Sequence, residues 1–149
     1  MLNLEQIHEM WEQDSKLDPA RLDNTSLESA KLHAKYLQLF DNARLMLKKK
    51  EIQMNELKLL KWRYYAGKMT KAEMDDLGWD YDPFHGATKP MKTELNQYID
   101  ADPDVSKLKL KVEYTKVVAS ALEEIINTLR WRHNVIKNII EFRKFQAGG

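Results

Sequence analysis

The clearest helical pattern in this sequence is in residues 105–143, VSKLKLKVEYTKVVASALEEIINTLRWRHNVIKNIIEFR, which contain neither Pro nor Gly. Mostly apolar residues recur at alternating steps of three and four, in a row formed by Val105, Leu108, Val112, Thr115, Ala119, Leu122, Ile126, Leu129, His133, Ile136, Ile140 and Arg143. This rhythm is typical of a helix that packs along one face against another helix. The pattern therefore predicts one long helix, which we place at residues 103–146.

The start of this helix has a clear signal that occurs twice in the chain. Asp102 precedes Pro103, and Asp18 precedes Pro19. Asp is a favoured N-cap, and Pro suits the first helical position. After Pro19 no Pro or Gly occurs until Gly67, which predicts a second long helix. Shorter helices are predicted at about residues 2–15, 71–77 and 91–99.

The sequence as a whole predicts an all-α protein, built as a hairpin of two long helices plus short helices. We treat residues 1–149 as a single helical domain, with N-terminal helices and a basic block in 1–72, an acidic linker in 73–102 and a C-terminal oligomerisation helix in 103–149. There is no cysteine, and no apolar run approaches the roughly 20 residues that cross a bilayer. We expect a soluble intracellular protein that does not enter a membrane.

A second apolar row lies beside the first, and Arg132 interrupts it. Its members are Val118, Ala121, Ile125, Thr128, Val135, Ile139 and Phe142. Two rows suit a helix that meets partners on both sides, either as subunits in a ring or as helices within one chain. We favour self-assembly into a ring-shaped homo-oligomer, through Leu122, Ile125, Ile126, Leu129, Ile136, Ile139 and Ile140.

Motifs for enzyme chemistry fail on inspection. His8 and Glu9 begin like a HExxH zinc helix, but Glu12 stands where the second histidine belongs. The four histidines lack metal-ligand spacing, and the acidic run at 75–82 lacks the Gly and Glu of an EF-hand loop. The sequence therefore predicts no catalytic residue, no metal and no cofactor, and a protein that is not an enzyme.

Charge is strongly blocked along the chain although its net value is +1. Residues 44–72 hold nine basic against two acidic residues, and residues 73–104 hold two against nine. Within the basic block, LKLLKWRYYAGKMTK (57–71) combines five cations with three aromatic residues and no acid. Cations bind phosphates, and unpaired bases stack on exposed rings for about 1–3 kcal/mol each.

This segment is therefore predicted to bind single-stranded DNA, through Lys58, Lys61, Trp62, Arg63, Tyr65 and Lys68. Lys58, Lys61, Tyr65 and Lys68 step by three and four, so they share one helix face. The blander alternative is that the aromatic side chains belong to the core and that the lysines form an ordinary solvated face.

Three stretches, LKLLKWRYYAGK, MKTELNQYIDADPDV and ALEEIINTL…IKNIIEFRKFQAGG, resemble the UvsY family of recombination mediator proteins of T4-like bacteriophages. The resemblance implies a non-enzymatic protein that binds single-stranded DNA and forms a ring-like hexamer or heptamer through its C-terminal region. It implies two further partners, the phage recombinase UvsX and the phage single-stranded-DNA-binding protein. The place of action would be the cytoplasm of the infected bacterial host.

The family's DNA-binding Lys and Arg fall on Leu59, with Lys58 beside it, and on Lys61. A different class of function remains open on the residues alone. It is a coiled-coil adaptor whose basic block binds an acidic protein or a membrane surface. Insensitivity to single-stranded DNA at moderate salt would favour the adaptor.

Overall fold

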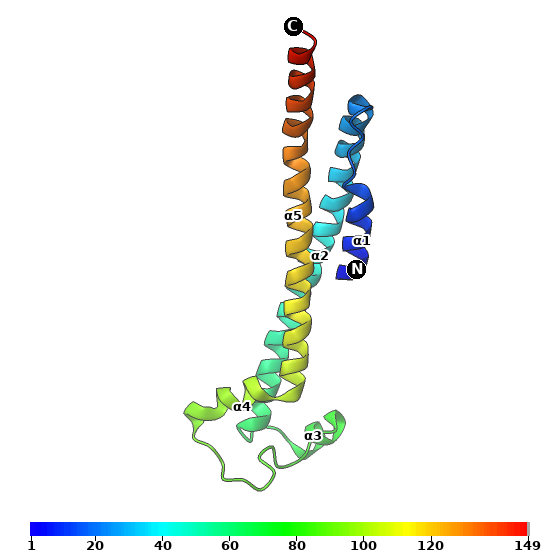
Figure 1. The fold of residues 1–149 in the computed structure, drawn as a ribbon. Helices are drawn as coiled ribbons and strands as arrows, with labels where there is room; N and C mark the ends of the chain where they lie inside the picture. Colours follow the sequence, from blue (N-terminus) through cyan, green and yellow to red (C-terminus); the bar gives the residue numbers. More distant parts are fainter. Residues whose placement is uncertain (149) are drawn as a thin grey trace. The chain divides into compact units, whose positions relative to one another are not determined.

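The all-α prediction is confirmed by the computed structural model, which describes residues 1–148 and contains no strand among them. Its helices, drawn in Figure 1, are α1 (Leu4–Asp14), α2 (Leu22–Tyr65), α3 (Lys71–Leu77), the short 3₁₀ helix η1 (Lys92–Glu94), α4 (Leu95–Ala101) and α5 (Pro103–Gln146). Each predicted helix has a counterpart near its expected place.

Helix α5 begins and ends where the sequence predicts. Asp102 caps it, because its Oδ1 accepts hydrogen bonds from the backbone N–H groups of Asp104 at 2.9 Å and Val105 at 3.4 Å. Pro103 takes the first helical position, where its missing N–H costs nothing. The helix then continues to Gln146, close to Gly148.

Helix α2 begins three residues later than predicted, and there the Asp-Pro signal was wrong. Asp18 Oδ1 accepts from the N–H of Ala20 at 2.9 Å, and the N–H of Arg21 bonds to the Asp18 carbonyl at 3.2 Å. These bonds close a turn around Pro19. The first helical bond is made by Thr25 N–H to the Arg21 carbonyl at 3.0 Å, so the helix starts at Leu22.

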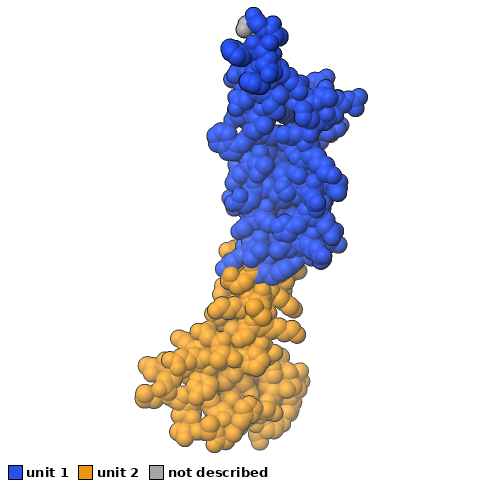
Figure 2. All heavy atoms as spheres, in the orientation of Figure 1, with its two compact units in different colours: residues 1–47, 114–149 blue, residues 48–113 orange. Residues whose placement is uncertain are grey.

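The chain divides into two compact units, coloured separately in Figure 2. Unit 1 contains residues 1–47 and 114–149, and unit 2 contains residues 48–113. Both long helices contribute residues to both units, so these units do not follow the three consecutive parts expected from the sequence.

The core of unit 1 unites α1 with parts of α2 and α5. Its buried members are Ile7, Tyr36, Ala43, Val118, Ala119, Leu122, Ile125, Ile126 and Leu129. Val118 and Ile125 belong to the second apolar row of α5, and they share this core with Ile7 of α1. Within unit 1, both rows of α5 therefore contribute to the interior of a single chain.

Polar contacts fasten α1 to this core. The Asp14 carboxylate accepts a hydrogen bond from the Tyr36 hydroxyl at 2.9 Å and pairs with Lys35 at 2.7 Å. Burial acts to raise the pKa of Asp14, but these two donors outweigh it and hold the pKa below its ordinary value. Arg132, the residue that interrupts the second row, donates to the Ser15 carbonyl at 2.5 Å and so caps the end of α1.

Unit 2 has its own, more aromatic core. Its buried members are Tyr64, Tyr65, Met69, Met74, Leu95, Ile99 and Val105. Thr70 caps α3 as predicted, accepting from the N–H of Glu73 at 3.2 Å. In residues 1–148, no helix has both the length and the apolar character needed to cross a membrane.

Candidate nucleic-acid interface

The last turns of α2 place the predicted DNA-binding residues in two different environments. Lys61 is only 3% exposed and Tyr65 only 8%, so both lie in the interior of unit 2. Trp62, adjacent to Lys61 in the chain, is 38% exposed. The spacing correctly placed Lys61 and Tyr65 on one face, but that face is turned inward.

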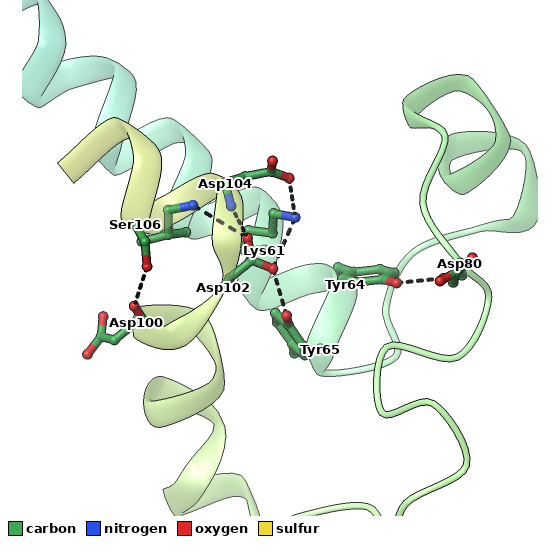
Figure 3. A network of polar contacts seen from close by, with 9 residues as sticks. Lys61, Tyr64, Tyr65, Asp80, Asp100, Asp102, Asp104 and Ser106 are labelled. Carbon is green, nitrogen blue, oxygen red and sulfur yellow. Dashed lines mark hydrogen bonds and ion pairs between the residues drawn. The ribbon is translucent and has the colours of Figure 1, made fainter. Parts of the chain in front are cut away.

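Lys61 is held in a cage of two carboxylates and one indole, of which Figure 3 shows the carboxylates. Its Nζ lies 2.8 Å from Asp104 Oδ2, 3.1 Å from Asp102 Oδ2 and 3.8 Å from the ring centroid of Trp79. A buried ammonium requires such partners, because desolvation without them is very costly. We name these four residues the Lys61 cage.

Tyr65 completes the polar network around Asp102. Its hydroxyl donates a 2.6 Å hydrogen bond to Asp102 Oδ2 (Figure 3). Burial acts to raise the pKa of Asp102, but the hydrogen bonds from Tyr65 and Lys61 outweigh it and hold the pKa below its ordinary value. Burial, aided by the hydrogen bond to Asp102, raises the pKa of Tyr65.

Tyr64 also lies in the core, as the blander alternative proposed for the aromatic residues. Its hydroxyl donates to the Asp80 carbonyl at 2.6 Å, and its ring centroid is 4.9 Å from that of Trp79. Burial raises the pKa of Tyr64, with nearby carboxylates adding to the shift. The role of Tyr64 and Tyr65 in this structure is to hold the loop around residue 80 and the start of α5 against the end of α2.

The exposed pair of predicted site residues lies at the end of α2 and just beyond it. Gly67 has a left-handed φ of 72°, its N–H bonds to the Tyr64 carbonyl at 3.2 Å, and the N–H of Lys68 bonds to the Arg63 carbonyl at 2.8 Å. This pair of bonds is the Schellman motif, which Gly permits because it has no Cβ. The reversal brings Lys68 Nζ to 4.8 Å from the Trp62 ring centroid.

Two other predicted residues are partly exposed and ion-paired. Arg63 lies 2.7 Å from Glu73, and Lys58 lies 3.6 Å from Asp100. Exposed ion pairs of this kind contribute about 0–1 kcal/mol, so a phosphate can compete with the carboxylates. The six predicted residues thus fall into an exposed pair, Trp62 and Lys68, two paired cations and two buried side chains.

Several exposed residues of α2 lie outside the six residues predicted to bind DNA. Ile52 is 49% exposed, Leu59 is 63% exposed, and Lys48 is exposed as well. Steps of four, seven and three place them on one face of α2 with Trp62, and the apolar spacing could have revealed this face. We name Lys48, Ile52, Leu59, Trp62 and the adjacent Lys68 the outer face of unit 2.

The predicted oligomerisation residues are mostly buried within unit 1. The side chains of Leu122, Ile125, Ile126, Leu129 and Ile136 are at most 5% exposed, whereas Ile139 is half-buried and Ile140 is 39% exposed. The five buried side chains have almost no surface left for another subunit. Sequence periodicity identified them as interior positions but did not distinguish an interior within the chain from one between chains.

A different row of α5 is apolar and exposed. It consists of Val117 at 51% exposed, Trp131 at 67%, Val135 at 46%, Phe142 at 60% and Phe145 at 76%. Their spacings of fourteen, four, seven and three follow the heptad rhythm of helix-to-helix packing. We name these five residues the outer row of α5. It shares Val135 and Phe142 with the second row predicted from the sequence.

The described residues bring no three His, Asp or Glu side chains together as a metal-binding group.

A model of the family described as "Recombination, repair and ssDNA binding protein UvsY" matches residues 10–149. The chain belongs to the UvsY family. The resemblance noted in the sequence is thereby confirmed.

Individual UvsY proteins are similar to this chain over almost its whole length. The recombination protein uvsY of Enterobacteria phage T4 is 22% identical over 147 residues, which are 99% of each chain. A crystal structure of the bacteriophage T4 recombination mediator protein UvsY matches with a TM-score of 0.83 at 21% identity, covering 99% of each chain. A second lattice type of that protein gives 0.80 at 19% identity, covering 97% of this chain and 99% of the other. The fold of unit 1 and unit 2 is therefore a UvsY fold.

Proposed function

We propose that this chain is a phage recombination mediator that binds single-stranded DNA through the outer face of unit 2. In this proposal it promotes loading of the UvsX recombinase onto DNA covered by the phage single-stranded-DNA-binding protein, during recombination-dependent repair and replication. It acts in the cytoplasm of the infected host, and it works by holding DNA, without catalysing a reaction. The observation that carries the proposal is the exposed pair of Trp62 and Lys68, in which Lys68 Nζ lies 4.8 Å from the centroid of the Trp62 ring.

The chemistry of this pair suits an unpaired nucleotide. A base can stack on the accessible indole of Trp62, for about 1–3 kcal/mol, while the ammonium of Lys68 binds the adjoining phosphate. Leu59 and Ile52 extend an apolar surface along the same face for further bases, and Lys48 supplies a second cation. These contacts do not read base edges, so binding is expected to have little sequence preference.

Assembly of several copies would multiply these weak contacts. The outer row of α5 offers a second copy of this chain an apolar helix face with heptad spacing. We place the subunit contacts there, and we retain the ring of six or seven subunits that the family resemblance implies. A strand that touches several copies gains avidity without any new type of contact. A strand bent over several copies would also release its covering protein more readily.

A strand-exchange assay with DNA pre-coated by the covering protein tests the proposed activity. The wild-type chain should stimulate UvsX, and the double variant Trp62→Ala/Lys68→Ala should lose most of the stimulation. Lys137→Ala, which removes an exposed lysine from unit 1, serves as the control and should act like the wild type. Absence of stimulation by the wild type would contradict the proposal and, with no DNA binding at moderate salt, would favour the adaptor.

Sedimentation velocity tests the proposed subunit contacts. The double variant Val135→Asp/Phe142→Asp places charges in the outer row of α5 and should dissociate the oligomer while its helix content is unchanged. Lys137→Glu introduces an acid in the same part of the helix, outside the row, and should sediment like the wild type. An oligomer that survives the double variant would place the subunit contacts elsewhere.

A further inference from the structure

Lys61 combines a basic side chain at the centre of the DNA-binding segment with almost complete burial. Lys61 as a whole residue is 3% exposed, and two carboxylates lie within 3.1 Å of its ammonium nitrogen. We propose that Lys61 is a positioning residue of the DNA site, which acts through the Lys61 cage on Trp62 and Lys68 and does not contact DNA. This inference rests on the proposed function of the outer face of unit 2.

The cage joins the end of α2 to the start of α5. Lys61 lies in the second-last turn of α2, whereas Asp102 caps α5 and Asp104 lies in its first turn. One ammonium bridges both carboxylates, and the Tyr65 hydroxyl binds the Asp102 oxygen that faces Lys61 (Figure 3). The position of the last turns of α2 is therefore fixed from inside unit 2.

The exposed pair is built on these same turns. Trp62 follows Lys61 directly, and its carbonyl accepts the N–H of Ala66 at 2.8 Å. The Schellman bonds from Gly67 and Lys68 to Tyr64 and Arg63 then set the place of Lys68 over the indole. A shift of the last turns thus changes both the orientation of Trp62 and its distance from Lys68.

The positive charge of Lys61 is required because its removal leaves a carboxylate without its counter-ion. Asp102 is 4% exposed, and an unpaired buried carboxylate draws in water or moves toward the surface. Neutralising both partners removes this conflict. Met approximates the length of the lysine stem. Asn at position 102 keeps one oxygen for the α5 cap, and its side-chain N–H can donate to the Tyr65 hydroxyl, which then accepts.

The first test compares Lys61→Met with the double variant Lys61→Met/Asp102→Asn, which has the net charge of the wild type. Affinity for a fluorescent oligo-dT is measured against salt, at a temperature where circular dichroism shows each variant folded. Lys61→Met should bind about tenfold more weakly, the loss expected when one stacked base is poorly held. The salt slope should stay unchanged because Lys61 itself makes no phosphate contact and the exposed Lys68 is still present, and the double variant should recover affinity.

A second test uses a residue at the exposed side of the cage, where a substitution leaves the buried Asp102 in place. The Asp104 side chain is 57% exposed, and Asp104→Asn weakens the hold on Lys61. If Lys61 contacted DNA, this change would free the cation and strengthen binding. If Lys61 positions Trp62, binding should weaken relative to Asp76→Asn, a control that removes an equal charge from the surface of α3.

Three results would overturn the inference while leaving the proposed function intact. The first is a salt slope that falls by about one in Lys61→Met, as loss of a phosphate contact predicts, without rescue in the double variant. The second is folded Lys61→Met that binds like the wild type, which would make the cage purely stabilising. The third is tighter binding by Asp104→Asn than by Asp76→Asn. Failure of the wild type to bind oligo-dT would instead contradict the proposed function itself.

Discussion

The Tyr65 hydroxyl donates a 2.6 Å hydrogen bond to the Asp102 carboxylate, and so the end of α2 is tied to the residue that caps α5. Both residues are buried in unit 2. Because Lys61 also binds this carboxylate, Asp102 accepts from a phenol, an ammonium and two backbone N–H groups. A single aspartate thus connects the two long helices.

Tyr65→Phe should destabilise unit 2 measurably. It removes one donor to a buried ionised group, a type of hydrogen bond worth about 1.5–3 kcal/mol. Urea denaturation followed by circular dichroism gives the free energy of unfolding. Tyr98→Phe is the matched control, since Tyr98 is 39% exposed, and it should change stability by less than about 0.5 kcal/mol. Equal effects of the two variants would contradict the role of the Tyr65 hydroxyl.

Acid should destabilise the protein through Asp102. Its pKa in the folded state is below the ordinary value of 3.8, so its stabilising contribution is complete above about pH 4. That contribution is lost as the pH falls through the folded pKa, because the unfolded chain takes up the proton first. Melting temperatures measured from pH 7 to pH 2 should fall less steeply in Asp102→Asn than in the wild type. Parallel curves would show that Asp102 does not contribute.

Gly67→Ala should weaken both the fold and the DNA site. The left-handed φ of 72° costs a residue with a Cβ about 1–2 kcal/mol. Any relief of this strain would move Lys68 away from Trp62. Asn tolerates the left-handed region better than Ala, so Gly67→Asn should retain more stability and more DNA affinity. Thermal melts and oligonucleotide titrations check both effects, and the reverse order of Ala and Asn would contradict this explanation.

Leu122 and Phe142 should behave in opposite ways although both are apolar residues of α5. Leu122 is 1% exposed in the core of unit 1, and Leu122→Ala should reduce stability by about 2–5 kcal/mol. Phe142 is 60% exposed, so Phe142→Ala should leave the stability of the dissociated chain nearly unchanged and weaken self-association. Denaturation at low protein concentration and sedimentation separate these effects. A large loss of stability in dissociated Phe142→Ala would contradict the assignment of the outer row.

The local signals of the sequence predicted the helices well, because capping and periodicity act over a few residues. Asp102 with Pro103 and Thr70 with its helix both behaved as their patterns indicate. Asp18 with Pro19 failed because the same dipeptide also suits a turn, and Asp18 bonds to Ala20 there. A helix start and a turn at this dipeptide differ only in the hydrogen bonds that the backbone N–H groups after Pro19 make.

The candidate site was harder to predict because it depends on contacts between distant residues. The spacing of Lys61 and Tyr65 defined a face but did not show that this face looks inward. The burial of Lys61 and Tyr65 depends on contacts with Asp102 and Asp104, some forty residues away. The acidic character of residues 73–104 was the one signal in the sequence that pointed to such partners. Likewise, the second row of α5 gave no sign that Ile125 would share a buried core with Ile7 of α1 while Phe142 stays exposed.

The most direct test of the central proposal is a titration of fluorescent oligo-dT, with a duplex competitor, across a series of salt concentrations. We expect the wild type to prefer the single strand, with salt-sensitive affinity. Trp62→Ala/Lys68→Ala should bind at least tenfold more weakly, because it loses a stacked base and a phosphate contact, whereas Lys137→Ala should match the wild type. Unchanged affinity in the double variant would contradict the placement of the DNA site on the outer face of unit 2.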